Sequence, residues 1–346
     1  MKKHKGKILV LFLAVLLVSV MSCENPFLKK MLVEEEKGKT VPEKPHAPFV
    51  EGGASLILSP DKLSIQVKAV TSDGSAIAVE GCTETTLTSG DSTYTWLHAT
   101  GTVVILKGKI IELYCGDPIN GIQNKLTALN VQGLTALQTL YCWNNQLTAL
   151  NVQGCTALES LYCEYNQLTT LNVQGLSALQ TLDCGSNQLT SLNVQGLTAL
   201  EDLYCGYNQL TALNMQGLTA LKWLGCQDNQ LTALNVQGCT ALQRLHCGDN
   251  QLTELNVQGL TALKELWCWD NQLTVLNVQG LTALKELWCW DNQLTVLNVQ
   301  GLTALKELWC YNNQLTELNV QGLTALEDLY CGYNQLTALN VQGEQL

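Results

Sequence analysis

The sequence predicts a β-rich solenoid with a parallel sheet on its concave face, mostly extended and turn segments on its convex side, and a small β-rich cap module before it. Three observations carry this prediction. One 21-residue pattern recurs from residue 137 to residue 346, and such a period is typical of stacked repeats. Inward and outward residues alternate within each copy with the period of a strand. Short strand-like runs separated by glycine turns precede the repeats.

The N-terminal residues predict a secretory signal peptide over residues 1–22. A lysine-rich start is followed by an apolar run over residues 8–21, which is shorter than a comfortable membrane span. The segment Val20-Met21-Ser22-Cys23 resembles the lipobox of bacterial lipoproteins, in which the cysteine is acylated. We therefore expect lipidation at Cys23. The alternative is an ordinary secreted protein that is cut near Ser22.

Residues 23–50 mix Lys, Glu and Pro, which predicts a lipid-anchored flexible linker. Residues 51–109 predict the small β-rich N-terminal cap module. Strand candidates lie at 55–58, 63–67, 76–79 and 102–106, with turn signals at Asp73-Gly74 and Glu80-Gly81 between them. We expect this module to shield the first repeat, and Cys82 within it has no assigned role.

Residues 110–346 predict eleven copies of the repeat, the first carrying six extra residues between Cys115 and Asn124. The copies at 260–280 and 281–301 are identical, which indicates a recent internal duplication. The pattern Leu137-x-x-Leu140-x-Cys142-x-x-Asn145-x-Leu147 resembles a leucine-rich repeat in which Cys takes one leucine position. The chain resembles bacterial leucine-rich repeat surface lipoproteins of the spirochaete and Bacteroides type and, more distantly, internalins. The resemblance implies a solenoid that takes part in adhesion and host interaction.

Within one copy, Leu140 and Cys142 are predicted to face the core, while the residues between them face outward. Stacked copies then form a parallel sheet with strands about 4.8 Å apart. The repeated asparagine is predicted to form a buried amide ladder that satisfies backbone groups where the chain leaves the sheet. Neighbouring cysteines have parallel Cβ vectors, which suits free thiols better than disulfides. The predicted structural ladder includes Cys142, Cys163, Cys184, Cys205, Asn145, Asn166, Asn187 and Asn208.

The outward positions differ most between copies, and their aromatic residues are predicted to line the concave face. The candidate ligand-binding residues are Tyr141, Trp143, Tyr162, Tyr204, Trp267, Trp269, Trp288, Trp290, Trp309, Tyr311 and Tyr330, with Glu265, Glu286 and Glu307 at one side. Exposed aromatic blocks mark binding surfaces, and Trp and Tyr are enriched at hot spots. A basic peptide, a protein segment or a sugar stacked on Trp fits this surface. The alternative is that the columns merely stack on one another.

Four aspartates recur two residues after the ladder cysteine, namely Asp228, Asp249, Asp270 and Asp291. Carboxylates this close repel one another unless a cation lies between them, so calcium is a weak candidate. The alternative is a solvated acidic edge. No other metal site and no cofactor are expected, since the cysteines lack the short spacing of zinc ligands.

The net charge of −11 and the lack of a basic cluster after residue 30 argue against a nucleic-acid partner. Enzyme motifs such as G-x-S-x-G, HExxH and the P-loop are missing from the sequence. The sequence therefore predicts a non-catalytic surface lipoprotein of the bacterial envelope, with an exposed position in the outer membrane favoured. It would touch the membrane only through its lipid and bind a host or bacterial protein in adhesion. The alternatives are a glycan-binding module and a passive envelope spacer. Because the chain ends in repeat register, end-to-end self-association is also predicted.

Overall fold

The computed structural model describes residues 46–90, 94–116 and 123–340. The predicted signal peptide, the lipidation site Cys23, most of the linker and the chain end used to predict self-association lie outside these ranges. Within the described ranges all regular elements are strands. None of the described residues forms a helix of the length and apolar character that crossing a membrane requires.

The module before the repeats contains six strands within its described residues, which pair in an antiparallel manner. They are β1 (Gly53–Leu58), β2 (Ser64–Thr71), β3 (Ile77–Glu80), β4 (Thr86–Leu87), β5 (Thr95–His98) and β6 (Val103–Lys107). Buried and half-buried residues alternate along all of β2, as expected of a strand with one face in the core. The strands β4 and β5 were not anticipated from the sequence.

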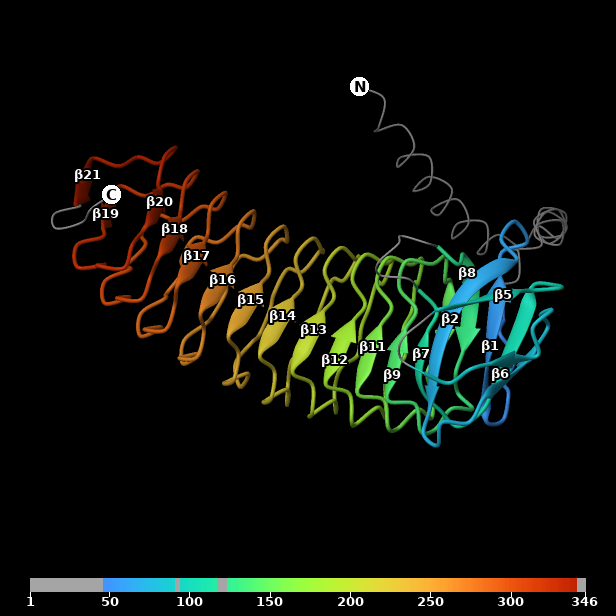
Figure 1. The fold of residues 1–346 in the computed structure, drawn as a ribbon. Helices are drawn as coiled ribbons and strands as arrows, with labels where there is room; N and C mark the ends of the chain where they lie inside the picture. Colours follow the sequence, from blue (N-terminus) through green and yellow to red (C-terminus); the bar gives the residue numbers. More distant parts are fainter. Residues whose placement is uncertain (1–45, 91–93, 117–122, 341–346) are drawn as a thin grey trace, which may run out of the picture. The chain divides into compact units, whose positions relative to one another are not determined.

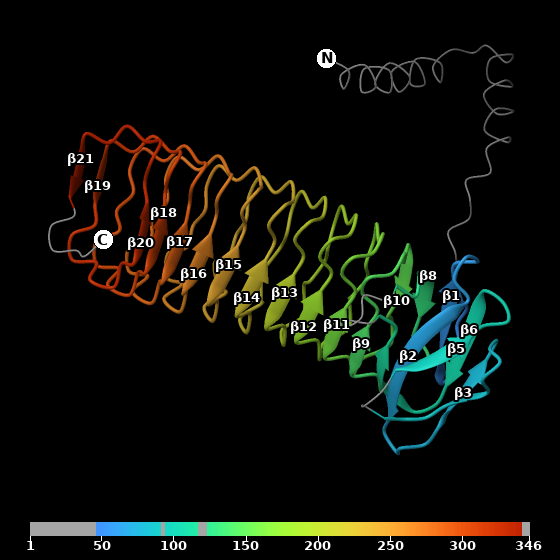
Figure 2. The same cartoon turned by 45° about the horizontal axis from the view of Figure 1, so that its top comes forward.

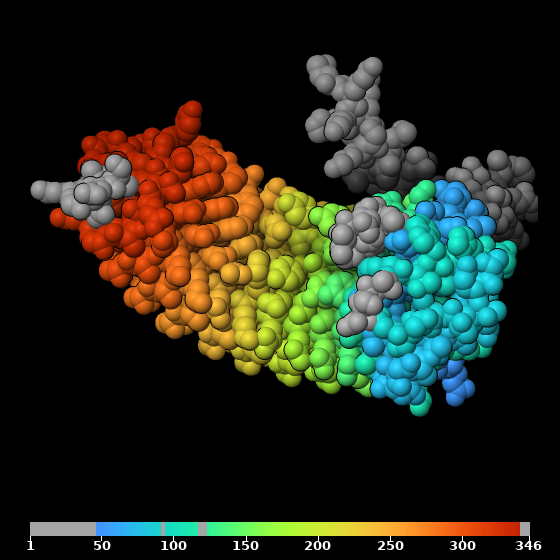
Figure 3. All heavy atoms as spheres, viewed as in Figure 1, coloured from blue at the N-terminus to red at the C-terminus, as the bar shows by residue number. Residues whose placement is uncertain are grey.

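The repeats form one long parallel sheet, to which β2 and β5 add an antiparallel end (Figure 1). Its strands are β7 (Ile110–Tyr114), β9 (Thr139–Tyr141), β11 (Ser160–Tyr162), β12 (Thr181–Asp183), β13 (Asp202–Tyr204), β14 (Trp223–Gly225), β15 (Arg244–His246), β16 (Glu265–Trp267), β17 (Glu286–Trp288), β18 (Glu307–Trp309) and β20 (Asp328–Tyr330). Equivalent residues pair directly, for example Trp267 with Trp288. The constant 21-residue period causes this register, and Figure 3 shows the successive repeats as closely packed bands.

The other side of each turn is extended or irregular, with short strands β8 (Leu126–Asn130), β10 (Ala149–Asn151), β19 (Glu317–Asn319) and β21 (Ala338–Asn340). A glycine ends this segment in each regular copy, and Gly154 has a φ of 83°. Only glycine adopts that conformation without strain. The predicted fold class, a helix-free solenoid with a parallel sheet and an extended back, is confirmed.

The core of the solenoid is a stack of leucines, valines and cysteines. Leu140, Cys142, Leu147 and Val152 are completely buried, and their equivalents recur along the stack. Burial raises the pKa of the Cys115 thiol to about 12 and that of Cys142 well above its ordinary value. The thiols are therefore protonated at neutral pH and pack as small apolar groups.

The repeated asparagine ties each turn to the one before it. The Asn145 side-chain oxygen accepts a hydrogen bond from the Leu126 amide at 3.0 Å. Its side-chain nitrogen lies 3.1–3.2 Å from the carbonyl oxygens of Cys115, Cys142 and Trp143. An apolar residue at this position would leave these buried groups unpaired.

The first turn has no preceding repeat, and β2 takes that place. The Asn124 side chain accepts from the Gln66 amide at 2.8 Å and donates to the Gln66 carbonyl at 2.7 Å. β2 also pairs with β7, while β1 pairs with β8, so both sides of the first turn are covered (Figure 2).

The last residues of the predicted linker, 46–50, lie within the described part of the chain. Ala47 is buried, and its carbonyl oxygen accepts a hydrogen bond from the Asn130 side chain at 3.0 Å. A Cβ atom at Gly133 would lie 1.8 Å from the Val50 carbonyl oxygen, so the approach at this point is very close. Ala47 and Val50 thus contact the first repeat through their carbonyl groups, whereas Phe49 is exposed.

Candidate functional site

The outward side chains of the parallel sheet form what we call the strand face. In the repeat at 260–280, Glu265, Trp267 and Trp269 point outward, while Leu266 and Cys268 between them are completely buried. The same alternation in every copy produces three parallel columns, named here the first, second and third columns. The side-chain placement follows directly from the two-residue period of a strand.

At the cap end, the second column is a stack of tyrosines. The ring centroids of Tyr114 and Tyr141 are 4.8 Å apart, and those of Tyr141 and Tyr162 are 4.3 Å apart, with nearly parallel planes. Tyr94 of the cap meets Tyr114 edge to face at 6.5 Å. Trp143, in the third column, lies over Gly116, where a Cβ atom would come 3.0 Å from the indole.

Farther along, six rings form what we call the tryptophan block. In the second column, Trp267 and Trp288 stack at 4.0 Å, and Trp288 and Trp309 stack at 4.5 Å. In the third column, Trp269 and Trp290 stack at 5.6 Å, and Trp290 and Tyr311 stack at 5.3 Å. All six residues are half-buried, whereas Tyr330 beyond them is exposed. The rings therefore cover one another's faces and present their edges outward.

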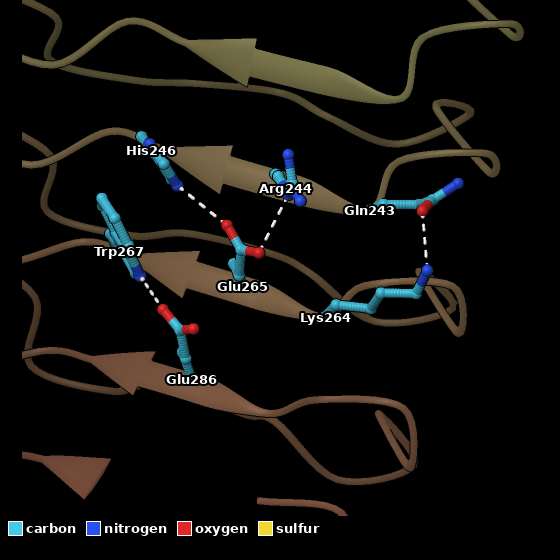
Figure 4. A network of polar contacts seen from close by, with 7 residues as sticks. All are labelled: Gln243, Arg244, His246, Lys264, Glu265, Trp267 and Glu286. Carbon is cyan, nitrogen blue, oxygen red and sulfur yellow. Dashed lines mark hydrogen bonds and ion pairs between the residues drawn. The ribbon is translucent and has the colours of Figure 1, made fainter. Parts of the chain in front are cut away.

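The glutamates of the first column contact the block from one side. The Trp267 indole nitrogen donates to Glu286 at 3.2 Å (Figure 4). In the next copy, the Trp288 indole nitrogen donates to Glu307 at 3.2 Å. The indole nitrogen of Trp309 is buried without a partner. The next residue in the first column is Asp328, whose side chain is one methylene shorter than that of glutamate.

Trp223, Arg244 and His246 belong to this surface, although the sequence reasoning did not select them. The guanidinium carbon of Arg244 lies 4.4 Å from the centre of the Trp223 ring, and its Nε donates to Glu265 at 2.9 Å. Figure 4 shows Arg244 and His246 on either side of the Glu265 carboxylate. A comparison of the first column between copies would have found Trp223 and the chain's single arginine.

His246 extends the tryptophan stack, since its ring lies 3.7 Å from that of Trp267. Burial, with a smaller effect of Arg244, lowers the pKa of His246 to about 4. The imidazole is therefore neutral at pH 7. Its Nε2 lies 3.6 Å from the nearest oxygen of Glu265, beyond hydrogen-bond distance.

The four aspartates considered for calcium have a backbone explanation. Asp228, Asp249, Asp270 and Asp291 have φ values between 47° and 54°. Asp and Asn tolerate this left-handed conformation better than most residues. Among the described residues, no group of three or more His, Cys, Asp or Glu side chains is arranged to hold a metal ion. The left-handed turn thus suits Asp at this position, and Tyr165, Ser186 and Tyr207 adopt the same conformation in other copies.

Two open hollows lie on the extended side of the solenoid. One of 690 Å³ is lined by residues from three turns and includes Val275, and one of 480 Å³ includes Val296. These two valines are 68% and 63% exposed. The sequence reasoning treated this side as purely structural, because its residues hardly vary between copies. It is the rival binding surface to the strand face.

A third hollow interrupts the strand face between Tyr162 and Tyr204, where the second column carries Asp183. It has a volume of 170 Å³, and Glu164 and Asp183 are among its lining residues. Burial raises the pKa of Glu164 to about 8 and that of Asp183 to about 6, and the Asp183 charge adds to the effect on Glu164. Neither residue was selected from the sequence as part of a site. We call this feature the acidic hollow.

Comparison with known proteins agrees with this architecture. A family model described as leucine-rich repeats in two copies matches residues 135–178. No curated protein sequence matches the chain. The structure is similar to the functional domain of InlJ from Listeria monocytogenes, which includes a cysteine ladder, with 29% identity and a TM-score of 0.59. That similarity covers 67% of this chain and 56% of InlJ's.

Two further structures are similar. A leucine-rich repeat protein of Leptospira interrogans is 30% identical with a TM-score of 0.55, over 62% of this chain and 66% of that one. YopM, a leucine-rich effector protein from Yersinia pestis, is 28% identical with a TM-score of 0.52, over 61% of this chain and 62% of that one. In all three cases the match spans less than two thirds of the known protein. Neither the family model nor these structures indicate a catalytic family. The chain therefore carries leucine-rich repeats and has the solenoid fold of leucine-rich repeat proteins.

Proposed function

We propose that this protein is non-catalytic and binds a partner protein on its strand face, with the tryptophan block as the main contact. The observation that carries the proposal is the contiguous set of six half-buried rings with glutamates along one side. Trp and Tyr are enriched at binding hot spots, where large rigid rings lose little entropy on binding. Stacked repeats offer the extended surface that such contacts need.

The charge of the surface favours a basic partner segment. Glu265, Glu286 and Glu307 follow one another along the first column, and only Glu265 has an ion pair with a nearby arginine. Burial raises the pKa of Glu286, and the charges of its two glutamate neighbours add to this effect. A cationic segment laid across the column would relieve this repulsion.

A glycan is the second candidate, since tryptophan faces commonly stack on sugars. The ring stacking argues against it here. The planes of Trp267 and Trp288 are 3° apart at a centroid distance of 4.0 Å, so the faces between them are already occupied. A partner meets mainly ring edges, which suits the side chains of a protein better than the flat face of a sugar. A passive spacer remains the outcome if nothing binds.

We also propose export and lipid anchoring through Cys23, with a role in adhesion at the bacterial surface. The support is the pattern of residues 2–23 and the likeness in fold to proteins of Listeria monocytogenes and Leptospira interrogans. Mass spectrometry of the N-terminal peptide tests the anchor. A diacylglyceryl group on Cys23 is expected, and an unmodified peptide beginning near Ser22 would contradict it.

The binding proposal is tested on an array of matrix proteins, cell-surface proteins and glycans probed with the purified chain. A variant with Trp267, Trp269, Trp288 and Trp290 all changed to Ala is probed alongside, after circular dichroism has established its fold. A Val275→Ser, Val296→Ser double variant serves as the control on the other side of the solenoid. We expect protein signals that disappear only with the tryptophan variant. Protein signals that survive it would contradict the proposal, and lost glycan signals would favour the second candidate.

A further inference from the structure

The acidic hollow lies where Asp183 interrupts the second column between Tyr162 and Tyr204. Four successive turns contribute its lining. Its lining residues are Glu164, Tyr165, Asp183, Gly185, Ser186, Tyr204, Gly206, Tyr207, Gly225 and Gln227. A volume of 170 Å³ is smaller than the pockets that hold drug-sized ligands. It has room for the end of one side chain.

Hydrogen-bond acceptors in the hollow lack donors. The Oε2 atom of Glu164 and the Oε1 atom of Gln227 are both buried, and neither has a hydrogen-bond partner. The Oδ1 atom of Asp183 accepts only the Gly185 amide, at 3.1 Å. None of the ten lining residues is a lysine, arginine or histidine. Buried acceptors without donors are unusual in folded proteins and costly.

Small residues keep the hollow open, and aromatic rings border it. A Cβ atom at Gly206 would lie 2.8 Å from the Gln227 side-chain nitrogen, so glycine allows the Gln227 side chain to fold over it. Tyr165 and Tyr207 are 60% and 56% exposed beside the carboxylates. Tyrosine rings next to carboxylates form a favourable environment for a cation, through both charge and the ring quadrupole.

We propose that the acidic hollow binds one organic cation of a partner, the guanidinium or ammonium group of an arginine or lysine side chain. Glu164, Asp183 and Gln227 Oε1 accept its N–H groups, and the tyrosine rings pack against its alkyl stem. The two buried acceptors without donors carry this inference. It rests on the proposed function in one respect, namely that a protein partner approaches the strand face.

The test uses three peptides, acetyl-Gly-Arg-Gly-amide, acetyl-Gly-Lys-Gly-amide and the neutral acetyl-Gly-Gln-Gly-amide, together with calcium chloride. Two-dimensional amide NMR of the purified chain follows the Gly185 and Gly206 signals. We expect saturable shifts with the arginine and lysine peptides, and their relative affinities identify the preferred cation. Equal shifts with the glutamine peptide, or shifts with calcium alone, would overturn the proposal.

Three variants locate the site. Glu164→Gln preserves the shape of the side chain but removes its charge, and we expect it to weaken arginine-peptide binding at least tenfold. Gly185→Ala places a methyl group in the hollow at 3.4 Å from its nearest neighbours, an ordinary contact, and we expect a similar loss. Glu201→Gln is the charge-matched control, because Glu201 pairs with Lys222 at 2.6 Å outside the hollow. We expect it to bind as the parent does.

Unchanged binding by Glu164→Gln would overturn the inference, and so would equal losses in all three variants. The peptide titration and the partner array are separate readouts. A lost peptide response with an intact array signal removes only the cation site. A failed array with an intact peptide response removes only the proposed function.

Discussion

The tryptophan block and the acidic hollow lie on the same sheet and share the same backbone, yet the block leaves two indole donors unpaired and the hollow leaves two acceptors unpaired. In the block, successive copies are identical or nearly so, and each ring stacks on its equivalent while two of the indoles donate to a glutamate of the next copy. In the hollow, successive copies differ. Asp183 stands between two tyrosines, and the carboxylate of Glu164 finds neither a cation nor a donor for its Oε2 atom.

This difference indicates which copies of a repeat protein are suited to bind a partner. Where neighbours are alike, lateral contacts within the sheet occupy the ring faces and the indole donors of Trp267 and Trp288, while the indole nitrogens of Trp290 and Trp309 stay unpaired. Where neighbours differ, the unpaired groups are the acceptors Glu164 Oε2 and Gln227 Oε1 rather than donors. We therefore expect the block to supply contact area and the hollow to supply selectivity for a cation.

The largest expected effect shows what the two regions share. Asn187 lies under the hollow and Asn292 under the block, and each side chain makes the same set of four contacts with the backbone. Changing either residue to Ala leaves buried groups unpaired and should lower the free energy of unfolding by about 3 kcal/mol. Urea denaturation of both variants measures this. Losses that differ by more than about 2 kcal/mol would show that the two frameworks are not equivalent.

The next effect separates the two regions. At pH 8, Glu164→Gln should raise the free energy of unfolding by about 2 kcal/mol, since it removes a buried charge that has no partner. Glu286→Gln should change it by less than about 0.5 kcal/mol, because Gln still accepts the Trp267 hydrogen bond. Denaturation of both variants under identical conditions provides the comparison. A destabilised Glu164→Gln variant would mean that the Glu164 carboxylate is already stabilised in the free protein.

The gain from Glu164→Gln should also depend on pH. The folded-state pKa of Glu164 is raised to about 8 from an ordinary value of 4.5. The stability of the parent protein therefore falls as the pH rises through this interval, since only the unfolded chain ionises freely. The gain should be close to zero below pH 4.5 and largest above pH 8. The lowered pKa of His246 makes the stability fall as the pH drops below 6.5. This effect is the same in the parent and in the Glu164→Gln variant, so it cancels in the comparison. A gain that stays constant between pH 5 and pH 8 contradicts the assignment.

The smallest effect concerns the edge of the block. Asp328→Glu lengthens the side chain by one methylene and should give the buried Trp309 indole the acceptor that Trp267 and Trp288 already have. We expect a gain of about 0.5 to 1 kcal/mol, measured as a higher melting temperature. Asp328→Asn, which leaves the reach of the side chain unchanged, is the control. An equal gain in both variants would show that the longer reach of glutamate is not the cause.

The fold class followed from the sequence because a fixed 21-residue period places the same residue at the same point of every turn. The outward direction of Trp267 and Trp269 followed equally from the alternation within a strand. The pairing of Asn124 with β2 did not, since it joins residues whose contact no local pattern encodes. The left-handed conformation of the aspartates was also missed, although Asp and Asn recurring at one position are a signal for it.

The acidic hollow could not be predicted, because it depends on space rather than on a motif. Asp183 and Glu164 were visible as departures from the aromatic columns, but nothing in their spacing indicated that burial would leave an acceptor without a partner. That outcome depends on Gly206, which lets Gln227 fold over the sheet, and on the lack of a basic residue among the lining side chains. A comparison of every outward column between copies would have identified this part of the strand face as unusual.

The central claim is that the strand face, rather than the extended side of the solenoid, binds the partner. The most direct test is a calorimetric titration of the partner selected on the array against three forms of the chain. These are the parent, a Trp267→Ala, Trp288→Ala double variant and a Val275→Ser, Val296→Ser double variant. We predict that the tryptophan variant weakens binding by about 30-fold or more, whereas the valine variant stays within about twofold of the parent. Loss of binding in the valine variant with full binding in the tryptophan variant would contradict the account.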